Sequence, residues 1–169
     1  KKLINKYLNI CIKSNDLFFF TAEINEKIIG YAILARKPKF LTSEFNSIKF
    51  LIILHLVLNF SFKTILNIFL SLTNIDLALI TKEKKNIIKN SFNLNLLAVD
   101  KNLQSKGIGK NFLNDIFTEL RRKNDIKIIT VETFDDRAAS FYENKVNFKY
   151  LGKKMRFLKN LKIYKKEDF

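Results

Sequence analysis

A strand, a glycine-containing loop and a helix follow one another in residues 94–120, and this unit constrains the fold more than any other part of the chain. The strand LNLLAV (94–99) is almost wholly apolar. After the loop, apolar residues recur on one face of a helix: Ile108, Phe112, Leu113, Ile116, Phe117 and Leu120. A second strand, KIITVET (127–133), comes next. A strand–helix–strand order predicts two parallel strands with the helix packed across them.

Further elements flank this unit on both sides. LFFFTAEI (17–24) and KIIGYAILARK (27–37) lie on either side of Asn25-Glu26, which predicts a β-hairpin. Asp135 or Asp136 can cap a short helix, RAASFYEN, because an Asx side chain accepts the free N–H groups of a first turn. The end of the chain predicts two more strands, FKYLG and KMRFLKNLKIYKK, around a turn at Gly152-Lys153. Residues 1–13 have helical spacing.

This order of elements predicts the α/β (α+β) class, with a mixed, mostly antiparallel central sheet of about six strands and flanking helices. The 169 residues suit a single domain, 1–169. An apolar, helical insert at 41–90 interrupts it. Within the insert, Lys63 is the one formal charge between Phe50 and Ile75, but polar residues interrupt the segment and make a membrane span a poor explanation. Amphipathic helices that pack on the domain, on a second subunit or against a membrane surface explain it better.

Composition excludes several kinds of site. One cysteine (Cys11) and one histidine (His55) cannot form a disulfide framework or a Cys/His zinc site, and we expect no metal. His55 lies in the apolar insert, where a structural role is the simpler reading. The net charge of +15 could attract nucleic acid, anionic lipid or a phosphate-bearing ligand. Because lysines are scattered through the whole chain, we expect no nucleic-acid partner.

The loop before the helix has the features of a phosphate-binding site. Gly107 and Gly109 leave room for a ligand close to the backbone, and the first N–H groups of the helix point outward. The helix dipole favours an anion there, and Lys106 and Lys110 add charge. The loop matches neither the nucleoside-triphosphate pattern G-x-x-x-x-G-K-[ST] nor the dinucleotide pattern G-x-G-x-x-G. A tight turn without a ligand remains the alternative on this pattern alone.

Two motifs together resemble the GCN5-related N-acetyltransferase (GNAT) family. QSKGIG (104–109), after a strand ending in Leu97-Ala98-Val99-Asp100, is similar to that family's acetyl-CoA signature, Q/R-x-x-G-x-G/A. DDRAASFYENKVNF (135–148) resembles its A-x-x-F-Y-E helix and the following strand. The resemblance covers residues 17–164 in element order, with the insert between the third and fourth family strands omitted.

The resemblance implies a cofactor site and two catalytic residues. Acetyl-CoA would be the acyl donor, its pyrophosphate held by the amides of 104–110 and its pantetheine arm lying between strands 94–99 and 127–133. The implied acetyl-CoA-binding residues are Leu97, Ala98, Val99, Gln104, Ser105, Lys106, Gly107, Ile108, Gly109, Lys110, Asp135, Ala138 and Phe141. Backbone N–H groups near Ala98 and Val99 would stabilise the oxyanion. Tyr142 would protonate the departing thiolate, with an amphipathic core tyrosine as the alternative.

The chain also departs from the family pattern. Asp135 stands where Asn is frequent, and Asn147 replaces a glycine one residue later than usual, although Asn tolerates the left-handed conformation. The strand at 94–99 and its approach carry Asn93 and Asn95 instead of a carboxylate base. Glu132 is the nearest candidate base, and a chain of waters is the alternative. Compared with the family's order of elements, we expect its first strand and first helix to be missing before residue 17, which would leave an open sheet edge and favour a homodimer.

The sequence thus predicts an acetyl-CoA-dependent N-acetyltransferase that acts on a primary amine, with an amino-sugar nucleotide as one acceptor suggested by analogy. A non-catalytic module of the same fold, which binds coenzyme A, a partner or a membrane surface, is the rival interpretation. We expect a cytoplasmic protein, with peripheral membrane contact through 48–75 as an alternative.

Overall fold

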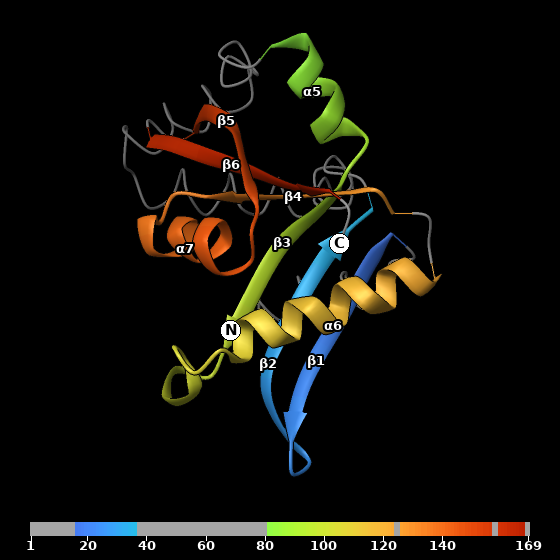
Figure 1. Cartoon of the computed structure of the whole chain (residues 1–169), viewed down its shortest axis with the longest axis vertical. Helices are drawn as coiled ribbons and strands as arrows, with labels where there is room; N and C mark the ends of the chain where they lie inside the picture. Colours follow the sequence, from blue (N-terminus) through green and yellow to red (C-terminus); the bar gives the residue numbers. More distant parts are fainter. Residues whose placement is uncertain (1–15, 37–80, 124–125, 157–158, 168–169) are drawn as a thin grey trace, which may run out of the picture.

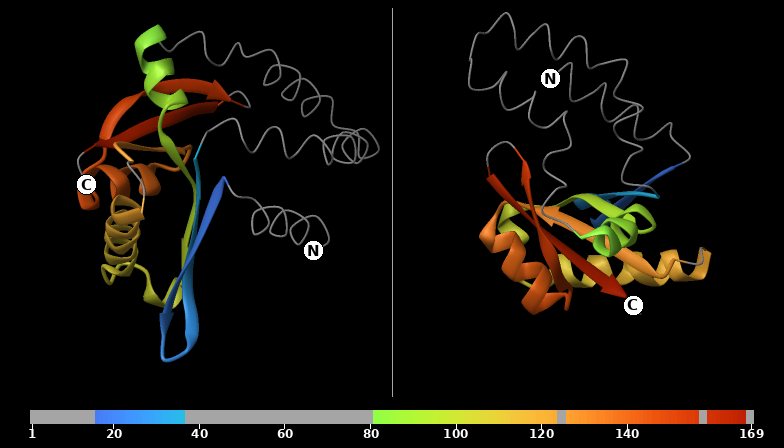
Figure 2. Two further views of the ribbon diagram at one scale, coloured as in Figure 1. Left: turned by 90° about the vertical axis from the view of Figure 1, so that its right-hand side faces the viewer. Right: turned by 90° about the horizontal axis from the view of Figure 1, so that it is seen from above.

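The described strands form one mixed sheet. The computed structural model describes residues 16–36, 81–123, 126–156 and 159–167. Six strands lie in the order β1-β2-β3-β4-β6-β5, and among them only β3 and β4 run parallel. Helices α6 and α7 lie over one side of the sheet, as Figures 1 and 2 show. The predicted class, a mostly antiparallel sheet of about six strands with flanking helices, is confirmed.

The N-terminal hairpin forms as its sequence predicts. β1 (Leu17–Ile24) pairs antiparallel with β2 (Lys27–Ala35). Asn25 and Glu26 both have positive φ angles, 49° and 62°, as the two central residues of a type I′ turn require. This turn matches the right-handed twist of the two strands, so the hairpin closes with only two loop residues.

The strand–helix–strand unit is present with slightly wider bounds. β3 (Phe92–Val99) is followed by α6 (Ile108–Lys123) and then by β4 (Ile128–Thr133). The expected apolar face of α6 is buried: Phe112, Leu113, Ile116, Phe117 and Leu120. These side chains join Leu94, Ile129 and Val131 in the main core, which fixes α6 across the parallel pair.

The predicted turn at Gly152-Lys153 is wrong. Both residues lie inside β5 (Lys149–Arg156), which pairs antiparallel with β6 (Lys159–Glu167). The register shifts between Tyr150 and Gly152, so the glycine lies at a β-bulge, where a residue without a side chain is also favoured. A Cβ at position 152 would stand 3.8 Å from Nζ of Lys84. Gly152 therefore lies under a neighbouring helix instead of in a turn.

That neighbour is α5 (Lys82–Lys89), the described end of the predicted insert 41–90. Thr81 caps its first turn by accepting from Lys84 N–H. Ile87 and Ile88 pack against Leu151 and Ile163, which form a small second core on the face of the sheet away from α6. The insert is helical where it is described, although this part is lysine-rich and not apolar.

Several predictions lie outside the described residues. They include the helix at 1–13, Cys11, His55 and the membrane contact through 48–75. In the ranges that are described, no helix is both long and apolar enough to span a bilayer.

Candidate active site

The parallel pair opens into a gap beside the loop that precedes α6. β3 and β4 pair only from Phe92 to Leu94 and from Ile129 to Val131. Beyond Leu94, β3 continues for five residues with β2 on one side and without a described strand on the other. Figure 1 shows β4 turning away while β3 runs on towards the loop. Main-chain groups of 95–99 on this side therefore lack the ladder partners that the first three residues have.

The loop after β3 is built from local hydrogen bonds. Asp100 caps a short 3₁₀ turn, η2 (Lys101–Leu103), by accepting from Asn102 N–H at 2.8 Å. Gln104 Nε2 donates to the carbonyl oxygen of Val99 at 3.0 Å and holds the loop against the end of β3. Ser105 has a φ of 64°. This sequence of turns brings residues 104–107 back to the start of α6.

The two glycines of the loop serve different purposes. Gly107 has a φ of +80°, and no described atom lies within 4 Å of the place where its Cβ would be. Gly109 lies in the first turn of α6, and a Cβ there would meet the ring of Phe141 at 3.4 Å and Val99 at 3.7 Å. Gly107 therefore permits the left-handed turn and leaves open space, whereas Gly109 permits close packing of α6 on β3 and on Phe141.

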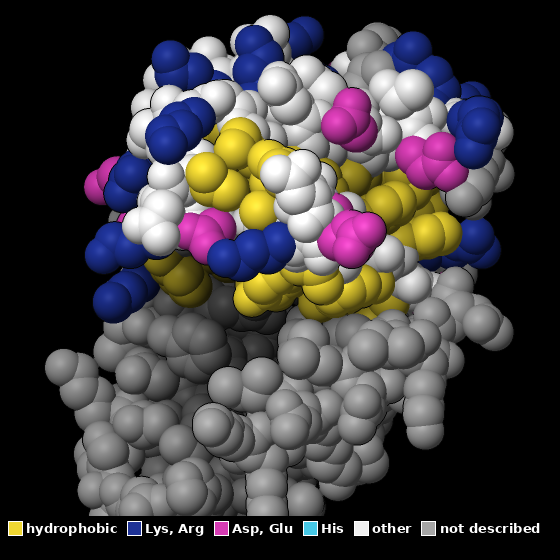
Figure 3. All heavy atoms as spheres, turned by 90° about the horizontal axis from the view of Figure 1, so that it is seen from below, with side chains coloured by type: hydrophobic (Ala, Val, Ile, Leu, Met, Phe, Trp, Pro, Cys, Tyr) yellow, Lys and Arg dark blue, Asp and Glu magenta, His cyan; other side chains and the backbone are white. Residues whose placement is uncertain are grey.

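Positive charge surrounds the start of α6. Lys106 and Lys110 are exposed at the beginning of this 16-residue helix, where the N–H groups and the helix dipole already favour an anion. Lys166 lies nearby: burial lowers its pKa, and the charge of Lys110 lowers it further. Figure 3 views this end of the molecule and shows Lys and Arg side chains, with Asp and Glu side chains among them, at the margin of an apolar surface. The start of α6 is thus suited to a phosphate group.

The segment after β4 closes the site from the side. Asp135 caps α7 (Asp136–Ser140), since its Oδ1 accepts from Ala138 N–H at 2.7 Å. A five-residue π-helix, η3 (Phe141–Lys145), continues α7 and is closed by Val146 N–H donating to the carbonyl oxygen of Phe141. The wider turn accommodates the extra residue noted in the sequence between Tyr142 and Phe148. Asn147 has a φ of 62°, as expected for the residue in the place of a glycine.

Tyr142 is held between two phenylalanine rings. Its ring contacts those of Phe141 and Phe148 edge to face, with centroids 5.3 and 5.6 Å away. The residue is 7% exposed, and burial raises its pKa to about 12, without a contribution from any charged neighbour. The phenol therefore keeps its proton over the whole physiological range. The ring belongs to the core, and its hydroxyl is a proton donor and not a base.

Glu132 has a partner of opposite charge. Its Oε1 accepts from Nζ of Lys154 at 2.7 Å, and the two side chains are 17% and 9% exposed. Glu132 lies next to Val131, the last β4 residue paired with β3, and so at the mouth of the gap. Lys154 therefore occupies one of the two oxygens of this carboxylate.

Two asparagines on β3 differ in their surroundings. Asn93 is buried and donates to Thr130 Oγ1 at 3.2 Å, and Thr130 Oγ1 also lies 2.8 Å from Ser91 Oγ. The Nδ2 atom of Asn95 is buried too, but it has no hydrogen-bond partner in the described part of the chain. The sequence marks both only as polar residues in an apolar strand, and it does not distinguish the paired amide from the unpaired one.

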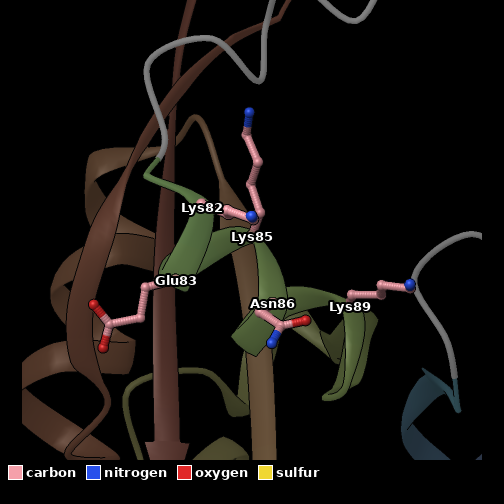
Figure 4. A pocket seen from close by; sticks show the side chains of 5 residues that line it. All are labelled: Lys82, Glu83, Lys85, Asn86 and Lys89. Carbon is pink, nitrogen blue, oxygen red and sulfur yellow. The ribbon is translucent and has the colours of Figure 1, made fainter.

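Other features of the described residues do not add to this site. They contain no cluster of His, Cys, Asp or Glu that could hold a metal ion. A surface hollow on α5 is lined by Lys82, Glu83, Lys85, Asn86 and Lys89, as Figure 4 shows. It lies at the opposite end of the molecule from the loop before α6 (Figure 1).

The structure brings most of the expected site residues together near the start of α6, whereas Glu132 lies apart from them at the opening of the gap. Val99, Gln104, Gly109 and Phe141 meet where β3, the loop and α6 join. Tyr142 lies beside Phe141 on the same side. Leu97, on the same strand as Ala98 and Val99, packs against the main core, as do Ala138 and Phe141. Glu132 lies at the opening of the gap, with Lys154.

Comparison with known proteins agrees with this geometry. Residues 83–157 match the family model described as "Acetyltransferase (GNAT) domain". No curated protein is significantly similar in sequence.

Solved structures share the fold at low sequence identity. An acetyltransferase from Thermus thermophilus has 11% identity and a TM-score of 0.60, and the match covers 98% of this chain and 73% of the other. A GNAT family acetyltransferase from Elizabethkingia anophelis, solved with acetyl-CoA bound, has 15% identity and a TM-score of 0.55, with 99% and 83% covered. The ribosomal-protein-S18-alanine N-acetyltransferase from Escherichia coli has 13% identity and a TM-score of 0.54, with 96% and 75% covered.

The matched segment, 83–157, runs from α5 through β3, the glycine loop and α6 to Tyr142 and β5, and so contains every residue of the candidate site except Lys166. This match covers less than half of the chain, and together with the shared fold it shows that the chain is similar to GNAT acetyltransferases.

Proposed function

We propose that the chain transfers the acetyl group of acetyl-CoA to a primary amine. The observation that carries the proposal is the gap between β3 and β4, which opens directly onto the glycine loop at the start of α6. The open space at Gly107 and the unpaired strand edge at 95–99 fit a phosphate group joined to a long, extended arm with amide groups. Coenzyme A has this shape.

Each part of the site has a role in this proposal. The amides of 104–110 and the charges of Lys106 and Lys110 bind the pyrophosphate. The free edge of β3, with Ala98 and Val99, pairs with the amides of the pantetheine arm and polarises the thioester carbonyl. Asp135, Ala138 and Phe141 form the wall on the side of α7.

The reaction is a direct transfer. The lone pair of the amine attacks the thioester carbonyl carbon, the C–S bond breaks, and the coenzyme A thiolate leaves. The phenol of Tyr142 gives a proton to the thiolate. The attacking amine nitrogen loses one proton as it becomes the amide nitrogen of the product. Because the pKa of Tyr142 is raised to about 12, the phenol is fully protonated before each turnover.

The base that receives the amine proton is Glu132 or a water. Glu132 lies beside the gap, but Lys154 occupies its Oε1 atom. A water-mediated route leaves this ion pair intact. Replacing Glu132 by Gln distinguishes the two, because a water route tolerates the change and a carboxylate base does not.

The acceptor is a small amine-bearing molecule in this proposal. The comparisons lend no support to an amino-sugar nucleotide in particular. A non-catalytic module that only binds coenzyme A remains the second candidate, favoured by the position of Tyr142 in the core, where its ring has a packing role without any chemistry.

The experiment measures thermal stability with and without acetyl-CoA, followed by thiol release with a panel of primary amines. Acetyl-CoA at 100 times its dissociation constant should stabilise the fold by about 2.7 kcal/mol. A Gly107→Glu, Gly109→Glu variant places carboxylates in the phosphate site and should lose this effect. Tyr142→Phe should keep binding and lose most of the turnover. No shift in the folded parent refutes the proposal, and a shift without turnover supports the binding module.

A further inference from the structure

Lys166 of β6 is a half-buried lysine whose side chain reaches the end of the segment that carries Tyr142. Its Nζ atom donates to the carbonyl oxygen of Val146 at 2.6 Å. Val146 follows η3 directly, and its own N–H closes the last turn by donating to Phe141. A lysine at a helix C-terminus satisfies a carbonyl that the helix leaves unpaired, and its charge suits the negative end of the helix dipole.

The same ammonium group lies over two rings of the main core. Its Nζ atom is 5.8 Å from the ring centroid of Phe117 on α6 and 6.0 Å from that of Phe148. At about 6 Å an ammonium group is attracted by the negative face of a ring. Phe148 also contacts the ring of Tyr142, and its N–H donates to the carbonyl oxygen of Tyr142 at 2.9 Å. Lys166 thus contacts the residues that hold Tyr142 on its C-terminal side.

The turn that carries Tyr142 is helped by a hydrogen bond from outside itself. η3 is a single π-helical turn, a conformation that is rare and is frequent at functional sites. The backbone closes it with the N–H groups of Val146 and Phe148. Lys166 adds a third bond from a position 20 residues further along the chain. Because its donor is charged, this bond is stronger than a bond between neutral groups.

Lys166 also lies near the start of α6, so phosphate binding is the alternative role. Burial lowers the pKa of its ammonium group, and the charge of Lys110 lowers it further. Lys110 is exposed, whereas the ammonium group of Lys166 already has a carbonyl oxygen and two rings around it. The described contacts of Lys166 are therefore with the end of η3 and with the core.

We propose that Lys166 is a positioning residue for proton transfer from Tyr142, because it fixes the end of η3 against α6 and β6. The transfer requires the phenol oxygen within hydrogen-bond reach of the departing sulfur. A shift of about 1 Å in such a geometry costs roughly 100-fold in rate. Since burial alone raises the pKa of Tyr142, Lys166 acts on the position of the phenol and not on its acidity. This inference rests on the proposed function and adds a residue from outside the matched segment 83–157.

The test is a double-mutant cycle in which Lys166→Met is made in the parent and in Tyr142→Phe. Thiol release from acetyl-CoA is measured with the primary amine on which the parent is fastest. In the parent, kcat should fall by roughly 10- to 100-fold, while KM for acetyl-CoA changes less than about 2-fold. In Tyr142→Phe the same substitution should cost less than about 2-fold, because no phenol is left to position.

Two more variants separate positioning from a general loss of structure. Lys166→Arg keeps a charged donor and should retain kcat within about 3-fold of the parent. Lys165→Met is the matched control, because Lys165 precedes Lys166 on β6 but pairs with Glu167, and it should leave kcat within about 2-fold. All assays are run at a temperature at which circular dichroism shows each variant to be folded. If Lys166→Met does not fold, Lys166→Gln, shorter by one atom and uncharged, replaces it with the same expected results.

Amide hydrogen exchange gives a readout that needs no turnover. The N–H groups of Val146 and Phe148 should exchange at least about 10-fold faster in Lys166→Met, as the loss of a hydrogen bond from a charged donor predicts. Residues 113–120 of α6 should keep the exchange rate of the parent.

Unchanged exchange at Val146 and Phe148 overturns the inference. So does a loss of kcat that is as large in Tyr142→Phe as in the parent. A rise in KM for acetyl-CoA without a fall in kcat also overturns it and assigns Lys166 to phosphate binding. A parent that releases no thiol refutes the proposed function instead, and the exchange result still decides whether Lys166 anchors η3.

Discussion

Gly107 and Gly109 should respond differently to the same substitution. Gly107 has a φ of +80° with open space around it, so Gly107→Ala costs backbone strain alone. A left-handed L-residue costs roughly 1–2 kcal/mol. Gly109 has no such φ, and its added methyl would meet Phe141 at 3.4 Å, a contact that a small shift of the ring relieves. Since alanine is also the better helix former, Gly109→Ala should change the free energy of unfolding by less than about 0.5 kcal/mol.

The assay is thermal or urea unfolding of the two variants without ligand. For a domain of this size, the strain at Gly107 corresponds to a decrease in melting temperature of about 2–8 °C. Gly107→Asn is the matched control, because asparagine visits the left-handed region more easily than alanine and should recover part of the loss. A larger loss for Gly109→Ala than for Gly107→Ala would refute the assignment of strain to the first glycine and of packing to the second.

Three further predictions concern the rest of the site. Asp135→Ala should lower the free energy of unfolding by about 1 kcal/mol through the lost cap, and Asp135→Asn should restore most of it in urea unfolding. Lys154→Met should lower the free energy of unfolding by roughly 3 kcal/mol in urea unfolding, because Glu132 is left without its partner. The double variant that also carries Glu132→Leu should recover most of this loss, and an equal loss in the single and the double variant would contradict an ion-pair role. The pKa of Tyr142 is higher in the folded protein than in the unfolded chain. The contribution of its neutral phenol to folding stability is therefore complete below pH 10 and is lost as the pH rises towards 12. Between pH 9 and pH 11 the parent should lose about 1.4 kcal/mol more than Tyr142→Phe, and identical pH dependence would show that the phenol is not buried.

Local signals in the sequence predicted the elements well. The Asn25-Glu26 turn, the buried face of α6 and the Asp135 cap each depend on residues within a few positions of one another. The left-handed Asn147 is of the same kind. In all of these the backbone conformation is decided by nearby side chains, so the sequence is sufficient.

Features that depend on distant segments were not predicted. Gly152 suggests a turn by its residue type, but α5 crosses over it and β6 pairs beside it. The ion pair of Glu132 with Lys154 and the contact of Gly109 with Phe141 join residues 22 and 32 positions apart. The roles implied for Tyr142 and Glu132 remain predictions, because neither burial nor pairing measures a reaction.

The short register between β3 and β4 divides the sheet into two units. β1, β2 and β3 form one, β4, β6 and β5 form the other, and three paired positions join them beneath α6. Amide hydrogens at this seam should exchange with solvent through the separation of the two units, before either of them unfolds. A molecule with its own amides that fills the gap would continue the ladder across the seam. The donor substrate would then act as an additional strand between β3 and β4. When it leaves after each turnover, the hydrogen bonds that join the two units would be lost, and the units would separate more readily.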